Sequence, residues 1–472
     1  MFTAIKNMIK FGTGGWRAVI GEDFICENIR KVAYGILKLA QEENKADMPV
    51  IIGYDRRFLS ESAAKWVAET LAAGGLEVWI LRRSAPTPLI MHTVKDKNLH
   101  FGIEITASHN PSNYNGIKLI VDEGRDAPLE TTQRLEQIIA EVEIPEYCNF
   151  SEAVEEGKII YLHSPFNKFI DDIIGLLDMN ALRERGLRVL FDTMHGSGTY
   201  PLQVIFFTAR CTLDTLNLNK DAYFGGMMPA PTEQTLASLK DAVTKGDYDL
   251  GIAMDGDGDR LGIIDSNGRY INANEILCML YYYLVSYKGW KGPVVRNLAT
   301  THMLDRIAES FGEKCYEVPV GFKYISSKID EVDAVLGGES SGGLTVRGHI
   351  HGKDSVYAAS LFAVTGKSAS EIMDSLEAQF GKFVMVEDNL RFTPEYKDVV
   401  NDIIFNQKKL PGFSKEVVKV SYEDGCKVYF EDESFVICRF SGTEPLLRIF
   451  AESDNKETAT SYITAFRTFL NI

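Results

Sequence analysis

Short runs of β-branched and other apolar residues alternate with stretches of helical periodicity along most of the chain. Between Glu130 and Val142, for example, Leu135, Ile138 and Ile139 fall with Val142 on one face of a helix. This alternation is typical of βαβ units with mainly parallel sheets. The apolar runs that we expect to form strands are Pro49–Asp55, Leu76–Leu81, Phe101–Ala107, Leu187–Thr193, Tyr248–Met254, Leu261–Asp265, Pro293–Leu298 and Ala334–Leu336.

The C-terminal part of the chain has a different order of elements. Three close-set strand patterns, Lys427–Glu431, Phe435–Phe440 and Leu447–Glu452, precede an apolar helix that ends near Leu470. Such an order indicates a smaller α+β domain. Ahead of it we expect three α/β units, with Leu261–Asp265 opening the third. The acidic, irregular segment 144–157 is expected to be a connection.

The composition excludes some classes of function. The chain has 472 residues, of which 45% are hydrophobic and 25% charged, as in ordinary globular proteins of several domains. Its formal net charge of −16 argues against nonspecific binding of nucleic acid. An acidic protein that binds phosphorylated ligands must gather Arg and Lys in one place, so basic residues in glycine-rich loops are of particular interest.

The cysteines predict the compartment. They are odd in number, scattered and without a C-x-x-C pair: Cys26, Cys148, Cys211, Cys278, Cys315, Cys426 and Cys438. This pattern indicates free thiols in a reducing compartment rather than a disulfide framework or a structural zinc site. We find no signal peptide and no apolar run long enough to cross a bilayer. We therefore expect a cytoplasmic protein without a membrane partner.

The first candidate loop, TASHNP (residues 106–111), directly follows the apolar run FGIEI. Open α/β sheets place reactive groups at the carboxyl ends of their parallel strands. Asn110 and Pro111 are expected to turn the chain and leave the Ser108 hydroxyl exposed. Ser108 is thus a candidate nucleophile, and a turn without chemistry is the alternative that this loop alone leaves open.

The second loop, DGDGDR (residues 255–260), also follows an apolar strand. Asp255, Asp257 and Asp259 alternate with glycines, so a compact backbone can direct several hard oxygen atoms at one divalent cation. Without a cation these carboxylates would repel one another. The loop is not an EF-hand, because its sixth residue is Arg260 and its twelfth is Ser266. A metal with an adjacent arginine indicates phosphoryl chemistry.

The third loop, GGESSGG (residues 337–343), contains a formal G-x-S-x-G match. A hydrolase of that type needs an acidic residue and then a histidine after the serine. The histidines after Ser340 are His349 and His351, with no Asp or Glu between Ser340 and His349. A flexible loop that presents a carboxylate and hydroxyls to a sugar is the better interpretation, and a plain glycine-rich turn is the alternative.

The fourth loop, RFSGTEP (residues 439–445), has Arg448 shortly after it. Ser, Gly and Thr between two arginines supply amide, hydroxyl and guanidinium donors in one turn, which is what a phosphate requires. A structural strand-turn-strand is the alternative.

Together these loops resemble the α-D-phosphohexomutase family, in particular its phosphoglucomutase and phosphomannomutase members. The resemblance extends from Phe11 to about Glu452 and is carried, in order, by FGTGGWR, TASHNP, NGIK, DTMHGSG, DGDGDR, VGFK, GGESSGG and RFSGTEP. It implies an α/β fold of four domains around a central cleft: three related mixed α/β sheet domains and a smaller C-terminal α+β domain. We place these domains at residues 1–150, 160–260, 261–372 and 380–472.

The resemblance also implies roles for individual residues. Ser108 would carry the phosphoryl group, with Arg17 of FGTGGWR and Lys118 of NGIK as further catalytic residues and Lys118 as a proton shuttle. Asp255, Asp257 and Asp259 would hold one Mg²⁺ per active site, with an oxygen of phosphorylated Ser108. The implied sugar-binding residues are Glu339, Ser341 and Gly321 of VGFK. The implied phosphate-binding residues are Arg260, Lys353, Arg439, Ser441, Gly442 and Thr443.

The implied activity is the interconversion of hexose 1-phosphate and hexose 6-phosphate, with glucose or mannose as the sugar. A hexose 1,6-bisphosphate would be the intermediate and activator, small phosphosugars the only partners, and the chain a monomer or homodimer. In one departure from the pattern, Gly343 stands where several members have a histidine. His349, His351 and Lys353 are the nearby candidates to replace it.

Three alternatives stay open at this point. A phosphatase using the Asp-rich loop would leave the serine, sugar and distal phosphate loops unexplained. A catalytically silent sugar-phosphate sensor would not need Ser108 and three aspartates. A relative acting on glucosamine phosphate, or making hexose bisphosphate as its product, has the same motifs and needs a substrate comparison.

Overall fold

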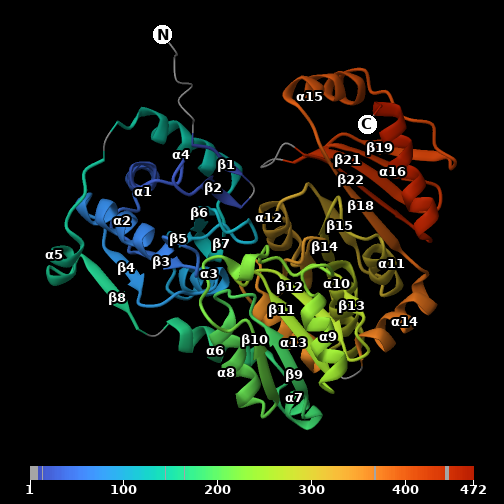
Figure 1. Ribbon diagram of the computed structural model, residues 1–472, viewed down its shortest axis with the longest axis horizontal. Coiled ribbons are helices and arrows are strands. Elements are labelled where there is room, and N and C mark those ends of the chain that lie inside the picture. The colour runs from blue at the N-terminus through green and yellow to red at the C-terminus, as the bar shows by residue number, and fades with distance from the viewer. Residues whose placement is uncertain are drawn as a thin grey trace. The chain divides into compact units, whose positions relative to one another are not determined.

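The computed structural model describes residues 9–12, 14–143, 145–163, 165–365, 368–441 and 446–471. The chain divides into two compact units, each made of two separate stretches of sequence. The first unit consists of Met1–Ala273 and Ser341–Ser368, and the second of Asn274–Ser340 and Ala369–Ile472. Figure 1 shows the elements of both units.

The first sheet of the first unit has the strand order β1-β2-β6-β5-β3-β4-β8, with β7 paired to β6. Strands β5, β3, β4 and β8 run parallel, whereas β1, β2 and β6 add antiparallel pairs beside β5. The strands are β1 (Phe11–Gly12), β2 (Gly15–Val19), β3 (Val50–Tyr54), β4 (Val78–Leu81), β5 (Phe101–Ile105), β6 (Tyr114–Val121), β7 (Arg125–Asp126) and β8 (Ile159–Leu162). The helices are α1 (Cys26–Glu42), α2 (Ser60–Ala73), α3 (Thr87–Asp96), η1 (Asp122–Gly124), α4 (Leu129–Glu141) and α5 (Phe150–Glu155).

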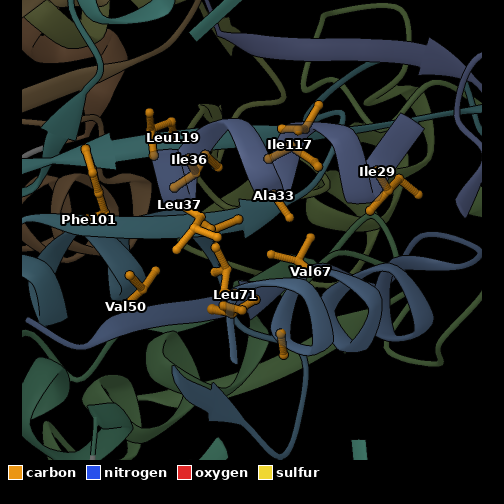
Figure 2. Packing of buried hydrophobic residues seen from close by; sticks show 14 of the residues in the cluster. Ile29, Ala33, Ile36, Leu37, Val50, Val67, Leu71, Phe101, Ile117 and Leu119 are labelled. Atoms are coloured by element: carbon orange, nitrogen blue, oxygen red, sulfur yellow. The ribbon is translucent and has the colours of Figure 1, made fainter. Parts of the chain in front are cut away.

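The core of this sheet explains why its central strands are so apolar. Every residue of β3 is buried, as expected for a parallel strand covered on both faces. Figure 2 shows one of these faces, where Ile36 and Leu37 of α1 and Leu71 of α2 pack against Val50 of β3 and Phe101 of β5. This packing fixes β5, and with it the loop that follows its carboxyl end.

The second sheet has the order β10-β9-β11-β12-β13, in which β10, β9 and β11 are parallel and β12 and β13 antiparallel. Its strands are β9 (Arg188–Asp192), β10 (Thr212–Leu216), β11 (Leu250–Met254), β12 (Leu261–Asp265) and β13 (Tyr270–Ile271). The first unit also contains α6 (Pro165–Leu176), α7 (Met179–Arg185), α8 (Thr199–Thr208), η2 (Phe224–Gly226), α9 (Ala237–Lys245), β17 (Leu344–Val346) and α13 (Ser355–Val364).

The position of β12 corrects one sequence-based expectation. Leu261–Asp265 pairs antiparallel with β11 over its whole length, with Met254 opposite Leu261, so its placement in the third α/β unit is wrong. The acidic loop is therefore a hairpin connection within the second sheet. The four domain ranges stay a prediction, and we propose that the boundary between the second and third domains moves from residue 260 to the end of β13.

The second unit contains a parallel arrangement in which β14 (Val294–Asn297) lies between β15 (Cys315–Val318) and β16 (Leu336–Gly338). It also has the antiparallel sheet β18-β22-β21-β20-β19, formed by β18 (Val384–Arg391), β19 (Val417–Ser421), β20 (Cys426–Phe430), β21 (Phe435–Phe440) and β22 (Leu446–Ser453). The helices are α10 (Ala273–Tyr282), η3 (Tyr283–Tyr287), α11 (Met303–Ser310), α12 (Phe322–Val332), α14 (Ala369–Phe380), α15 (Pro394–Val400), η4 (Asn401–Asn406) and α16 (Lys456–Leu470). Figure 1 shows α16 alongside the antiparallel sheet.

The expected fold class is confirmed: mixed α/β sheets precede a C-terminal antiparallel sheet, and helix α16 follows the last strand of that sheet. One connection was misjudged: the segment 144–157 contains helix α5. Its N-cap is Asn149, whose side-chain oxygen accepts hydrogen bonds from the amides of Ser151 and Glu152, a standard helix start that acidic composition concealed.

Within the described ranges, no helix has both the length and the apolar character needed to span a membrane.

Candidate active site

Ser108 lies just beyond the carboxyl end of β5, on the turn that leads into β6. Its backbone is left-handed (φ 52°), which is uncommon outside glycine and needs surrounding contacts to hold it. Thr106 supplies such contacts: its Oγ1 accepts from the Ser108 amide at 2.8 Å and donates to Asp55 at 2.7 Å. The side chain of Ser108 is fully buried, so the expectation of an exposed hydroxyl is wrong. The reason is the loop after β11, whose Gly256 packs directly against the Ser108 carbonyl.

Arg57 holds the whole Ser108 turn in place. Its buried guanidinium donates to four carbonyls of that turn: Nη1 to Pro111 at 2.8 Å and Tyr114 at 3.1 Å, and Nη2 to Ser108 at 2.5 Å and Asn110 at 2.6 Å. A planar fork of fixed donors suits this task, whereas lysine offers a single rotating ammonium. Sequence analysis missed Arg57, because its role depends on contacts with a loop 51 residues further along the chain.

Three carboxylates gather on the hairpin between β11 and β12. Asp255, Asp257 and Asp259 are fully buried, and each offers an oxygen within 4.8 Å of the others. Lys118 Nζ donates to Asp257 Oδ2 and Asp259 Oδ2, both at 2.7 Å, and Thr87 Oγ1 donates to Asp257 at 2.6 Å. In the part of the chain that the structure describes, the buried Oδ1 atoms of Asp257 and Asp259 have no hydrogen-bond partner. Such hard oxygen ligands fit a divalent cation of the Mg²⁺ or Ca²⁺ type.

Asp255 connects the carboxylate cluster to the Ser108 turn. Its Oδ2 accepts a hydrogen bond from Ser108 Oγ at 3.0 Å. Its Oδ1 accepts from the amides of Asp259 at 2.9 Å and Arg260 at 3.1 Å, which curls the loop around this carboxylate. The structure therefore places Ser108 next to the three aspartates that the sequence predicts as a metal site.

The carboxylates of this cluster and Lys118 shift one another's pKa values. Burial raises the pKa of Asp255 well above its usual range, and the charges of Asp257 and Asp259 raise it further. For Lys118, burial lowers the pKa, but the same two neighbouring aspartates outweigh burial and hold it above the ordinary value. Lys118 is therefore protonated in this arrangement. Burial raises the pKa of Asp257 and Asp259, but the charge and hydrogen bonds of Lys118, together with other neighbours, outweigh burial and lower both. The pKa of Asp255 stays raised, so this is the carboxylate whose charge a bound divalent cation would stabilise.

Cationic side chains surround the same turn. Arg17 of β2 donates from Nη1 to Asn110 Oδ1 at 2.6 Å. Burial, followed by the charges of Arg260, Arg17 and Lys353, lowers the pKa of His109 well below its usual range. Besides burial, three cations therefore act on His109 in a chain whose net charge is −16. Concentrated arginine and lysine beside a serine hydroxyl suit an anionic phosphoryl group.

Lys353 fills the space of the missing side chain at Gly343. A Cβ atom on Gly343 would lie 2.1 Å from Lys353 Cδ, and the ammonium lies 3.2 Å from Asp259 Oδ2. His349 is not available for this role, because its Nε2 is bound to Asp354 Oδ2 at 2.6 Å in a buried pair. Of the candidates to replace the absent histidine, Lys353 is the one that the structure places at the carboxylate cluster.

Gly343→Ala tests whether this packing matters. The new methyl group must displace the Lys353 stem, so we expect turnover to fall by ~10-fold, the scale of a lost charge-assisted contact, without loss of folding. Steady-state kinetics and a thermal melt measure the two effects. Gly175→Ala is the control, since no atom lies within 4 Å of a Cβ built there. Unchanged turnover of Gly343→Ala would show that the position of Lys353 is unimportant.

The expected sugar-binding residues are divided between the units. Ser341 belongs to the first unit, and Gly321 and Glu339 belong to the second. Gly321 precedes α12 with φ 134°, a conformation that favours glycine. Glu339 follows β16 and is buried, and Asn297 at the end of β14 donates from Nδ2 to Glu339 Oε2 at 3.3 Å. Asn297 is a second residue that sequence analysis missed.

The loop that we expect to bind the distal phosphate leaves β21 in the second unit. Arg439 on β21 lies directly opposite Arg448 on β22, and like charges across a strand pair are unfavourable unless an anion or acid compensates them. Ser441 donates its amide to the Leu446 carbonyl at 2.8 Å. Gly442 and Thr443 lie outside the described residues. The roles of all these side chains stay predictions.

Profiles of one family cover nearly the entire chain. They are described as phosphoglucomutase/phosphomannomutase, alpha/beta/alpha domain I over residues 8–145, domain II over 167–268 and domain III over 272–380, and the C-terminal domain over 386–468. The domain II match extends past β12, in agreement with its place in the second sheet.

Individual proteins are similar over the same length. A phosphoglucomutase/phosphomannomutase of Thermococcus kodakarensis is 30% identical over 457 residues, 96% of each chain. A phosphoglucosamine/phosphogalactosamine mutase of Sulfurisphaera tokodaii is 27% identical over 466 residues, 97% of this chain and 98% of the other. The crystal structure of a candidate phosphomannomutase from Thermus thermophilus has a TM-score of 0.85 at 26% identity and covers 98% of this chain and 99% of that one. This chain belongs to the phosphoglucomutase/phosphomannomutase family of isomerases.

Proposed function

We propose that this phosphohexomutase interconverts hexose 1-phosphate and hexose 6-phosphate through a phosphorylated Ser108, a hexose 1,6-bisphosphate intermediate and one Mg²⁺ ion. The observation that carries the proposal is the hydrogen bond of 3.0 Å between Ser108 Oγ and Asp255 Oδ2. It places a hydroxyl suited to covalent phosphoryl transfer at the edge of a buried cluster of three carboxylates.

When bound, such a cation would neutralise negative charge on the phosphoryl oxygens during transfer. Asp255, Asp257 and Asp259 would hold it, since two of their buried oxygens lack a partner among the described residues. Lys118 is assigned the proton shuttle at Ser108 Oγ. It would donate a proton to the serine oxygen as the phosphoryl group leaves and take up the proton of the attacking sugar hydroxyl, and its contacts with Asp257 and Asp259 hold it at the carboxylate cluster.

The cations around the turn bind the group that is transferred. In each half-reaction the bond between Ser108 Oγ and phosphorus breaks or forms while a sugar oxygen forms or breaks its own bond to phosphorus. Arg17, Arg260 and Lys353 provide fixed positive charge for the oxygens of that phosphoryl group, which is the main contribution a protein can make to this reaction.

The remaining loops bind the parts of the sugar phosphate that do not react. Glu339, Ser341 and Gly321 are assigned to the sugar hydroxyls, and Arg439 and Ser441, together with Gly442 and Thr443, to the distal phosphate. A mutase needs such a loop, because its bisphosphate intermediate must present first one phosphate and then the other to the serine.

The sugar itself requires a direct comparison. Glucose, mannose and glucosamine 1-phosphates should be tested side by side with Mg²⁺ and catalytic hexose 1,6-bisphosphate. Glucosamine belongs in the panel because the Sulfurisphaera tokodaii relative is a phosphoglucosamine/phosphogalactosamine mutase. Formation of a 6-phosphate supports the proposal, whereas steady release of inorganic phosphate would identify a phosphatase instead.

Arg439→Ala tests the distal loop. If this arginine binds the phosphate that is not reacting in both half-reactions, its loss should raise KM for 1-phosphate and 6-phosphate substrates by similar factors. One charge-assisted contact corresponds to a change of ~10- to 100-fold. Phosphoryl transfer from Ser108 should suffer less than binding. An effect on only one of the two substrates would show that the loop serves a single orientation.

A further inference from the structure

Asp424 lies in the turn between β19 and β20 and contacts two of the segments assigned to the substrate. Its Oδ2 accepts a hydrogen bond from the amide of Val320 at 2.8 Å, the residue before Gly321. Its Oδ1 accepts from Arg439 Nη2 at 3.3 Å. One half-buried carboxylate therefore connects the Gly321 loop to the guanidinium proposed to bind the distal phosphate.

The next residue fixes this turn against the backbone of Arg439. Gly425 has a left-handed conformation (φ 88°). A Cβ atom there would lie 2.6 Å from Arg439 Cβ and 2.7 Å from the Cys438 carbonyl oxygen. Only glycine permits so close an approach in this conformation, so the position of Asp424 relative to Arg439 is set by backbone contact and not only by the flexible side chain.

A second contact ties β20 to the segment that leads to Gly321. Lys427 is buried, and its Nζ donates to Glu317 Oε2 at 2.6 Å and to the Leu298 carbonyl at 2.7 Å. Glu317 belongs to β15 and precedes Val320 by three residues. The segment 317–320 is thus attached at both ends, by Glu317 to Lys427 of β20 and by Val320 to Asp424 of the turn before β20.

Two features of Arg439 favour an acidic partner. It faces Arg448 across the strand pair, and a long guanidinium side chain loses considerable rotamer freedom when a ligand fixes it. Its buried Nε has no hydrogen-bond partner among the described residues, so a donor remains for an anionic ligand. A carboxylate that holds Nη2 in advance reduces the ordering that binding requires.

We infer that Asp424 is a positioning residue that orients Arg439 for the distal phosphate and, through the same carboxylate, fixes the Gly321 loop. The inference rests on the proposed function, since it assigns the way in which two of its binding segments are held together. Asp424 itself does not contact the reacting atoms.

The test separates the two halves of this contact. Asp424→Asn keeps an oxygen that can accept from the Val320 amide but removes the charge that holds Arg439, and Asp424→Ala removes both. We expect Asp424→Asn to raise KM for 1-phosphate and 6-phosphate substrates by ~10-fold, with kcat unchanged. Asp424→Ala should raise KM at least as much. Glu423→Gln, which removes one charge from the exposed neighbour, is the control and should match the wild type.

A double-mutant cycle distinguishes positioning from a general structural effect. If Asp424 acts through Arg439, Asp424→Asn should change KM by less than ~2-fold in an Arg439→Ala background, because contacting residues are not additive. A full and additive increase would overturn the inference, and so would a loss of kcat at unchanged KM.

Binding of inorganic phosphate separates this inference from the proposed function. Calorimetry should show that Asp424→Asn and Arg439→Ala weaken the same phosphate site to a similar extent. If the wild type turns over no sugar phosphate but this loss is still observed, the proposed function fails and the inference stands. The inference is wrong if Arg439→Ala does not weaken phosphate binding relative to the wild type. It is also wrong if Asp424→Asn binds phosphate as tightly as the wild type.

Discussion

Ser108→Ala should abolish mutase activity and remove the phosphoryl group from the purified protein. The serine is the only covalent acceptor in the proposed mechanism, and its Oγ lies 3.0 Å from Asp255 Oδ2. Loss of a covalent nucleophile costs several orders of magnitude, so turnover should fall by at least ~1,000-fold. Intact mass and peptide mapping of wild type and variant measure the phosphate, and a coupled assay measures turnover.

Ser112→Ala is the matched control for this experiment. Ser112 lies two residues beyond Asn110 on the same connection, and the proposal gives it no role. The Ser112→Ala variant should keep the phosphate on Ser108 and the activity of the wild type. Phosphate found on any residue other than Ser108, together with full activity of Ser108→Ala, would eliminate the phosphoserine mechanism.

Asp257→Asn should reduce turnover by at least ~100-fold while the protein stays folded, because one anionic ligand of the cation is lost from a buried site. The Oδ1 atom of Asp257, buried and without a hydrogen-bond partner in the described ranges, is the atom whose role is tested. Removing Mg²⁺ from the wild type with EDTA should have a similar effect, and added Mg²⁺ should restore activity.

The control for this substitution is Asp241→Asn. Asp241 is an exposed aspartate of α9 that pairs with Lys245 four residues along the helix, and such surface pairs contribute little. Its activity should be normal. Full activity of the wild-type enzyme in excess chelator would remove the metal from the proposal, whatever the effect of Asp257→Asn.

The sequence allowed the reactive loops to be placed because each follows a strand whose pattern is unambiguous. Leu250–Met254 is a continuous apolar run, and Phe101–Ile105 is apolar except for Glu104. Both are buried strands with a parallel neighbour in the structure. Chemistry at the carboxyl ends of parallel strands is a general property of such sheets. Ser108 and the three aspartates were therefore expected at the carboxyl ends of their strands. That they also lie close to one another depends on tertiary structure, and it agrees with the resemblance of the motifs.

What escaped prediction depends on contacts between distant segments. Arg57 resembles any arginine after a strand until its four carbonyl partners are seen. Lys353 was one of three candidates, and tertiary contacts separate it from His349: Lys353 packs against Gly343 and contacts Asp259, whereas His349 is bound to Asp354. The strand Leu261–Asp265 was assigned to the wrong sheet because its apolar pattern is compatible with either neighbour, and pairing with β11 decides the matter.

The divided sequence of each compact unit has a consequence for synthesis. The first unit needs Ser341–Ser368, which is made only after the intervening segment Asn274–Ser340. At ribosomal rates the delay from Ala273 to Ser368 is roughly 5–20 s. During that interval the nascent chain lacks α13, in which every residue is buried, so apolar surface on α7 and α8 stays uncovered. Chains stalled on the ribosome before Ser341 should be cut readily by protease in this region, and chains released after completion should resist.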